Sequence, residues 1–198
     1  MSLTRVHLRR TRRATVLILA LMFAVSAVGC ASAHYKSTDA GVLKGKILVE
    51  WYEPDLFIYR PDATTPLSFT RRSGSTIAPG TMYTDGGSVP RPFWILRNYS
   101  PWGYGPAFIV HDWLFHEQNC KEGDYHSVKE AAKIMSEVMK TLKESPNFRY
   151  GSKSSMYAMY EAVQTTPAVD AWEHGKCVKP GEIQIKRTPD ATFVVEVK

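Results

Sequence analysis

The chain has 198 residues, of which 44% are hydrophobic and 22% are charged, and its formal net charge is +6. Five of its 25 basic residues are arginines within the first 29 positions, so residues 30–198 carry 20 basic side chains against 19 acidic ones. This remainder lacks the clustered surplus of Lys and Arg typical of nucleic-acid binding, and we expect no nucleic-acid partner. Its length is enough for one domain with its own hydrophobic core.

Residues 1–29 predict a secretory signal peptide, because their arginines precede an apolar run, TVLILALMFAV at 15–25. The run leads into Ala27-Val28-Gly29-Cys30, which resembles the lipobox of bacterial lipoproteins. The resemblance implies cleavage before Cys30, a lipid such as palmitate on its sulfur, and the membrane as a partner. Since residue 31 is Ala rather than Asp, it also implies the outer membrane, on the periplasmic side of the cell envelope. The alternatives are secretion after cleavage at Ala33 and an uncleaved anchor helix.

Two further cysteines, Cys120 and Cys177, follow in the exported part of the chain. Disulfides form and persist outside the cytoplasm, so we predict that these two residues pair. Two free thiols or a metal-binding pair remain as the alternative, although no CxxC or Cys/His spacing accompanies either residue.

Residues 31–41 are small and polar, which is typical of a tether. We therefore expect a signal peptide at 1–29, a lipid anchor and tether at 30–44, and a single domain at 45–198. From Gly45 the chain shows short β-like runs separated by Pro, Asp and Gly. These runs predict strands at 46–52, 55–60, 66–72 and 76–84.

The middle of the chain predicts three helices, at 105–117, 127–145 and 154–164. Gly105-Pro106 suits a helix start, Ser127 and Glu130 have the spacing of a capping box, and the third helix should stop before Pro167. The C-terminus returns to alternating hydrophobic residues, from Ile183 to Val197, and predicts a hairpin. The expected fold is α+β: a small antiparallel sheet packed with three helices, of which 105–117 is the central one.

The apolar run FIVHDWLF at 108–115 contains His111 and Asp112, two side chains that are costly to bury. Neighbouring residues on a helix point about 100° apart, so we expect these two to address different partners rather than each other. An ionised Asp112 among apolar side chains would need a cation, a metal ion or several N–H donors.

The loop TDGGSVPRPFW at 84–94 offers a carboxylate, a hydroxyl and a guanidinium in Asp85, Ser88 and Arg91. One reading is a hairpin turn in which Asp85 accepts hydrogen bonds from local N–H groups. The other is a loop that folds over His111 and Asp112, with Arg91 or a metal ion facing the carboxylates. Ser88 lacks the G-x-S-x-G elbow of a nucleophilic serine.

Three segments together, APGTMYTDGGSVPR (78–91), WGYGPAFIVHDWLF (102–115) and KEAAKIMSEVM (129–139), resemble the phage and bacterial family called domain of unknown function 1353. The resemblance covers about 45–165 and implies a fold and a phage-related origin, but no established reaction. Where the family usually has Ala-Asp, this chain has Ala131-Ala132. If that aspartate orients the histidine, Asp124 is the nearest substitute in the sequence.

The sequence HDWLF also resembles the His-Asp helix of secreted phospholipases A2. That resemblance implies His111 as general base and a calcium ion held by Asp112, with Asp85 as a further ligand. Against it, Leu114 and Phe115 replace the usual Cys and Tyr, and the glycine-rich calcium loop is not recognisable. A site of the HD-phosphohydrolase type would need histidines before the pair, where residues 30–110 contain only His34.

Two hypotheses about function remain, and the sequence does not decide whether the protein is an enzyme. The first is a non-catalytic binding or structural lipoprotein with a buried His-Asp-Arg network, formed by His111, Asp112 and Arg91. The second is a calcium-assisted ester hydrolase that uses His111 and Asp112. The sequence leaves a protein partner unknown.

Overall fold

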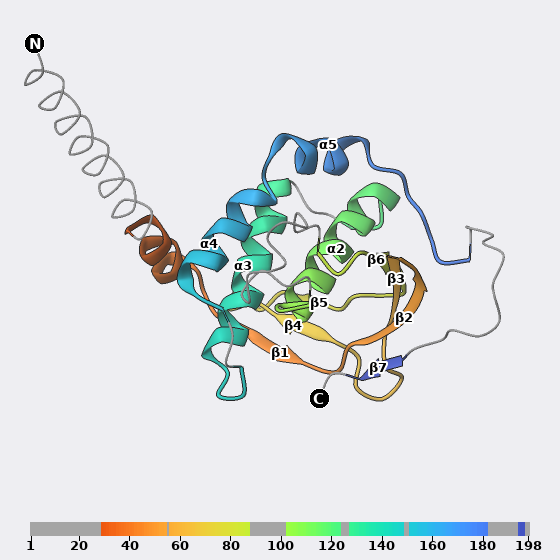
Figure 1. Cartoon of the computed structure of the whole chain (residues 1–198), viewed down its shortest axis with the longest axis horizontal. Coiled ribbons are helices and arrows are strands. Elements are labelled where there is room, and N and C mark those ends of the chain that lie inside the picture. Colours follow the sequence, from red (N-terminus) through yellow and green to blue (C-terminus); the bar gives the residue numbers. More distant parts are fainter. Residues whose placement is uncertain are drawn as a thin grey trace, which may run out of the picture.

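The computed structural model describes residues 29–54, 56–87, 102–123, 127–148, 151–181 and 194–196. The fold is α+β, as predicted, and the helices gather on one side of the strands (Figure 1). A helix at 29–37 comes first. The other elements are β1 (Val42–Lys44), β2 (Leu48–Glu53), β3 (Leu56–Arg60), β4 (Ser68–Thr70), β5 (Thr76–Ile77), β6 (Met82–Thr84), α2 (Gly105–Cys120), α3 (Val128–Glu144), α4 (Lys153–Ala162), α5 (Thr166–His174) and β7 (Val194–Glu196).

The described strands form two antiparallel sheets rather than the one that the sequence predicted. The first has the order β1-β4-β5, and the second has the order β6-β3-β2-β7. The run expected as one strand at 76–84 is divided, because Pro79 and Gly80 interrupt it and Pro cannot donate to a ladder. Its two halves, β5 and β6, consequently join different sheets. Strand β7 pairs with β2, while Ile183, on the other arm of the expected hairpin, lies outside the described residues.

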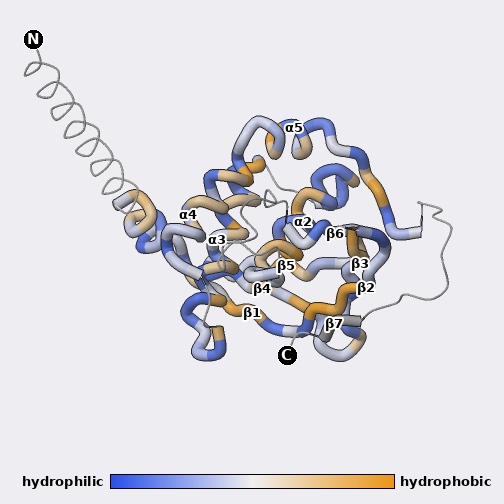
Figure 2. The backbone as a smooth tube through the Cα atoms, viewed as in Figure 1, coloured by the Kyte–Doolittle hydropathy of each residue, from blue (hydrophilic) through white to orange (hydrophobic). Residues whose placement is uncertain are grey.

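Helix α2 is central, as expected, and packs against α3, α5 and β6. It begins with Gly105-Pro106 and continues three residues beyond its predicted end. Figure 2 shows the hydrophobic first half of this helix and the more hydrophilic turns that follow. Seven of its residues are buried, all of them in the first ten positions: Gly105, Ala107, Phe108, Ile109, Val110, His111 and Leu114. One polar side chain, His111, is therefore part of the core.

Helix α3 starts at the predicted cap, where Ser127 Oγ accepts a hydrogen bond from the backbone N–H of Glu130 at 3.2 Å. The Glu130 side chain pairs with Arg71, which follows β4, at 2.6 Å. Arg71 also donates to both carboxylate oxygens of Glu137, at 2.7 and 2.8 Å. Since Glu137 is only 3% exposed, this bidentate pair supplies the buried carboxylate with its donors and ties the strand end to α3.

The described residues contain more helices than the three predicted. Pro167 was expected to end the helical region, yet it lies in the first turn of α5. At that position a missing N–H costs nothing, so the same residue that stops one helix can start the next. Helix α5 lies across the outside of the helical layer and buries Trp172 against α2 (Figure 1).

The segment expected as a tether is helical at 29–37 and is attached to the domain. Lys140 Nζ on α3 donates to the backbone carbonyls of Tyr35 and Thr38, at 3.1 and 2.7 Å. His34 bonds to Ser136 at 3.2 Å and packs on the ring of Tyr160 at 4.2 Å. The preceding residues 1–28 lie outside the described part, and no described helix is long and apolar enough to cross a membrane.

Candidate functional site

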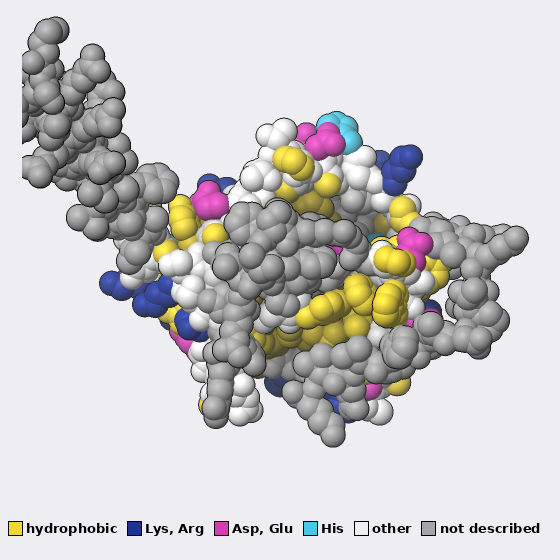
Figure 3. All heavy atoms as spheres, in the orientation of Figure 1, with side chains coloured by type: hydrophobic (Ala, Val, Ile, Leu, Met, Phe, Trp, Pro, Cys, Tyr) yellow, Lys and Arg dark blue, Asp and Glu magenta, His cyan; other side chains and the backbone are white. Residues whose placement is uncertain are grey.

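A cavity of about 640 Å³ opens beside α2. Its walls come from one face of α2, the end of β6 with the residues that follow it, helices α4 and α5, and the segment around Cys177. The volume lies within the usual range for pockets that hold small organic ligands. In the space-filling view, α5 presents polar atoms on its outer side and hydrophobic atoms below them (Figure 3).

His111 lines this cavity and is only 8% exposed. Its ring packs against Phe115 with 4.8 Å between the ring centres. Its Nδ1 atom lies 3.8 Å from Asp112 Oδ1, which is longer than a hydrogen bond. Its Nε2 atom is buried and has no hydrogen-bond partner among the described residues. A buried polar atom without a partner is costly, so this nitrogen is the strongest indication of a ligand in the cavity.

Asp112 also lines the cavity, and it is held by a residue that the sequence analysis did not single out. Thr84 Oγ1 donates to Asp112 Oδ2 at 2.5 Å and accepts from the backbone N–H of Gly86 at 3.0 Å. One hydroxyl thus joins α2 to the loop after β6. Thr84 directly precedes Asp85 in the sequence Thr-Asp-Gly-Gly. This position beside a candidate residue was the sequence feature that could have pointed to it.

The described part of the loop packs against α2, which agrees with the reading in which this loop folds over the helix. A Cβ atom on Gly87 would lie 2.8 Å from the ring of Phe108, and Gly87 has a φ of +110°. Asp85 lines the cavity, but its Oδ1 accepts from the backbone N–H of Gly87 at 2.9 Å, as the other reading expected. The remaining predicted residues of this loop, Ser88 and Arg91, lie outside the described residues.

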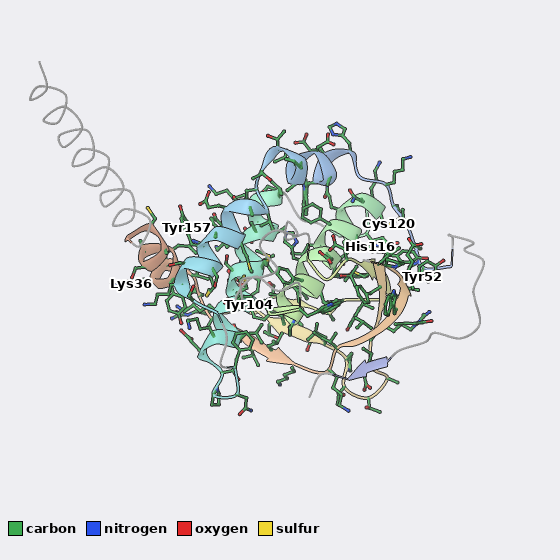
Figure 4. The ribbon with its side chains drawn as sticks, in the orientation of Figure 1. Lys36, Tyr52, Tyr104, His116, Cys120 and Tyr157 are labelled. Atoms are coloured by element: carbon green, nitrogen blue, oxygen red, sulfur yellow. A yellow bond between two sulfur atoms is a disulfide. The ribbon has the colours of Figure 1, made fainter. Side chains whose placement is uncertain are left out.

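The opposite end of the cavity is formed by the last turns of α2 and the segment after α5. Cys120 and Cys177 form the predicted disulfide, and their neighbours Asn119 and Lys176 line the cavity. His116 lies one turn before Cys120, and both are seen at the same end of α2 in Figure 4. Burial lowers the pKa of His116, although the charge of Glu122 opposes the shift.

The described residues contain no group of three or more His, Cys, Asp or Glu side chains that could hold a metal ion. Asp112 and Asp85 were the predicted calcium ligands. Both line the cavity, but each already accepts a hydrogen bond within the protein. Ala132, where the family usually has Asp, is fully buried on α3, and Asp124 lies outside the described residues.

A family model described as "Protein of unknown function (DUF1353)" matches residues 63–163, which is just over half of the chain. The matched range includes the loop after β6, helix α2 with its His-Asp pair, and helix α3. It lies within the region over which the sequence resemblance was predicted. Comparison with curated proteins and with solved structures gives no match.

Proposed function

Because the chain belongs to the domain of unknown function 1353 family, for which no reaction is established, we propose a function from the geometry of the cavity. The protein is a lipid-anchored cell-envelope protein whose domain binds a small, largely apolar molecule without transforming it. The observation that carries this proposal is His111, which lines a cavity of about 640 Å³ and whose buried Nε2 atom has no partner among the described residues. A ligand would supply the missing hydrogen bond.

The contacts of Asp112 support a structural role for this carboxylate. It accepts the hydrogen bond from Thr84, and Thr84 in turn is fixed by the N–H of Gly86. The aspartate therefore holds the loop against α2 and shapes the mouth of the cavity. These contacts differ from the predicted network of His111, Asp112 and Arg91, in which Arg91 remains a proposed member.

Membrane attachment through Cys30 is the second part of the proposal. Cys30 is a free, exposed cysteine, so its sulfur is accessible for modification. The lipobox-like sequence that ends at Cys30 supports lipidation, and Ala31 in place of Asp supports an outer-membrane location facing the periplasm; cleavage at Ala33 is the alternative. Replacing Cys30 with Ser should abolish labelling of the expressed protein by a fatty-acid analogue. Label that persists in the C30S protein would contradict the anchor.

A second candidate function is hydrolysis of an ester, with His111 as general base. The observation that favours it is the 3.8 Å distance between His111 Nδ1 and Asp112 Oδ1, in a pair of side chains that both line the cavity. A carboxylate beside Nδ1 stabilises the imidazolium that forms when Nε2 takes a proton from water. In this hypothesis a calcium ion would bind near Asp112 and Asp85.

The two candidates are separated by assaying the wild-type protein and His111→Ala on a panel of p-nitrophenyl esters and phospholipids. The binding hypothesis predicts no turnover above buffer for either protein, and weaker ligand binding by the variant. The hydrolase hypothesis predicts turnover that falls at least about 100-fold in the variant. His174→Ala, which changes an exposed histidine on α5, is the matched control. A shift of the melting temperature by millimolar calcium, reversed by EDTA, would further favour the hydrolase.

A further inference from the structure

One wall of the cavity follows helix α2. His111, Phe115 and Asn119 all line it, and they are spaced four residues apart on one face of the helix. Eight residues of α-helix rise about 12 Å, which gives the length of this wall. A ligand that lies along this wall from His111 to Asn119 spans that length.

The polarity of the cavity changes along this length. At the inner end, His111 is accompanied by the buried side chains of Phe108 and Met159. At the outer end, Lys176 is exposed beside Asn119. Between the two ends the described lining is mainly apolar, although His116 also belongs to it. Phe115 packs edge-on against Trp172 there, and small alanines of α4 and α5 leave the space open: Ala158, Ala162, Ala168 and Ala171.

At the inner end of the cavity, the ligand should supply a hydrogen-bond donor. The nearby Asp112 carboxylate can only accept, so it favours the tautomer in which His111 Nδ1 carries the hydrogen. Nε2 then has a free lone pair on a side chain that lines the cavity. A hydroxyl or an amide N–H satisfies it, whereas an ether or a bare hydrocarbon does not.

We propose that the cavity binds a linear alkyl or acyl chain of about eight to ten carbons, whose terminal hydroxyl or amide N–H donates to His111 Nε2. An extended chain advances about 1.3 Å per carbon, so about nine carbons span the wall from His111 to Asn119. The proposal rests on the proposed ligand-binding function and names the chemical class of the ligand.

The test uses the folded, full-length mature chain and a series of 1-alkanols from about six to about fourteen carbons. Calorimetry measures direct binding, and displacement of N-phenyl-1-naphthylamine measures relative affinity. Each added methylene should strengthen binding about fourfold while it is being buried. Beyond about ten carbons the chain reaches the outer end, and each further methylene should add less than about twofold.

Two pairs of measurements locate the ligand. Ala162→Phe fills the apolar wall and should weaken 1-decanol binding at least about tenfold, whereas Ala63→Phe, at an exposed site outside the cavity, should not. Ala158→Phe is a second filling variant in case the first does not fold. Wild-type protein should prefer 1-octanol to methyl octyl ether by about tenfold, and His111→Leu should abolish that preference.

The outcomes separate this inference from the function on which it rests. If neither N-phenyl-1-naphthylamine nor any alkanol binds, the ligand-binding function fails and the inference fails with it. If the probes bind but affinity shows no break near ten carbons, the linear-chain ligand is wrong while ligand binding stands. If the preference for the hydroxyl survives in His111→Leu, the assignment of His111 as the acceptor is overturned.

Discussion

Arg71 is the residue that connects the two halves of the fold most directly. Its guanidinium donates to Glu137 through two nitrogens and to Glu130 through a third, and these carboxylates raise its pKa. Glu137 is almost fully buried, so its charge depends on these donors. Removing one partner of a buried pair costs much more than removing an exposed one, because the other charge is left without compensation.

We therefore expect Arg71→Met to lower the free energy of unfolding by roughly 3–5 kcal/mol. The neighbouring Arg72 is the natural control, because its side chain is 77% exposed and pairs with an exposed Asp39. Arg72→Met should change the free energy of unfolding by less than about 1 kcal/mol. Urea denaturation of both variants measures the difference. Equal effects would mean that the Glu137 carboxylate does not depend on Arg71.

At the scale of elements, the disulfide attaches the segment after α5 to the end of α2. It closes a loop with a sequence separation of 57 residues, and the residues on both sides of Cys177 line the cavity. The bond thus holds one cavity wall in place as well as restricting the unfolded chain.

Replacing Cys120 and Cys177 together with Ala should destabilise the domain by about 4 kcal/mol, on the chain-entropy account of disulfides. A lower melting temperature in the double variant, matched by wild-type protein in reductant, is the expected result. Cys30→Ser removes a free cysteine and should leave the melting temperature unchanged. The prediction fails if reductant has no effect on the wild-type protein.

The sequence predicted elements well where a local signal was sufficient. Ser127 caps α3 as expected, and the hydrophobic spacing located α2, α3 and α4 to within a few residues. The sequence did not predict the elements whose structure depends on tertiary contacts. The helix at 29–37 has no apolar stripe and is held by Lys140 and His34, and α5 was missed because Pro167 suits a helix start as well as a stop.

The candidate site was predicted less completely than the fold. The sequence singled out His111, Asp112 and the loop after Thr84 as candidates, since polar groups in an apolar run are conspicuous, and described residues of each line one cavity. It did not identify Thr84 as the partner of Asp112, because threonine is common in strands and its hydroxyl needs a contact 28 residues away to reveal its role. Nor could any local pattern indicate that α4 and α5 form the opposite wall.

At the scale of the whole molecule, two histidines far apart in the fold have a lowered pKa for the same reason. Burial is the largest cause for both His34, beside α4, and His116, on α2. Their unfolded pKa is about 6.5, so on acidification the unfolded chain takes up protons that the folded chain resists. The stability that these groups contribute is present above the unfolded pKa and is lost as the pH falls below it.

The free energy of unfolding should therefore be smaller at about pH 5.5 than at about pH 7.5. His116→Asn should reduce that difference, and His174→Asn, at an exposed site, should not. Carboxylates with a lowered pKa, such as Asp62 and Glu122, titrate at lower pH and act outside this window. Urea denaturation at both pH values gives the result, and identical stabilities would contradict the burial of these imidazoles.

The attachment of residues 29–37 to α3 limits how far the domain can move from anything joined to Cys30. If the eleven residues at 31–41 were a flexible tether, the domain could move over roughly 20 Å relative to Cys30. Because residues 31–37 are helical and Lys140 bonds to the carbonyls of Tyr35 and Thr38, most of that freedom is removed. If Cys30 carries the proposed lipid, the domain is held in one orientation and at one height above the membrane, so the membrane surface around it decides which molecules reach the cavity.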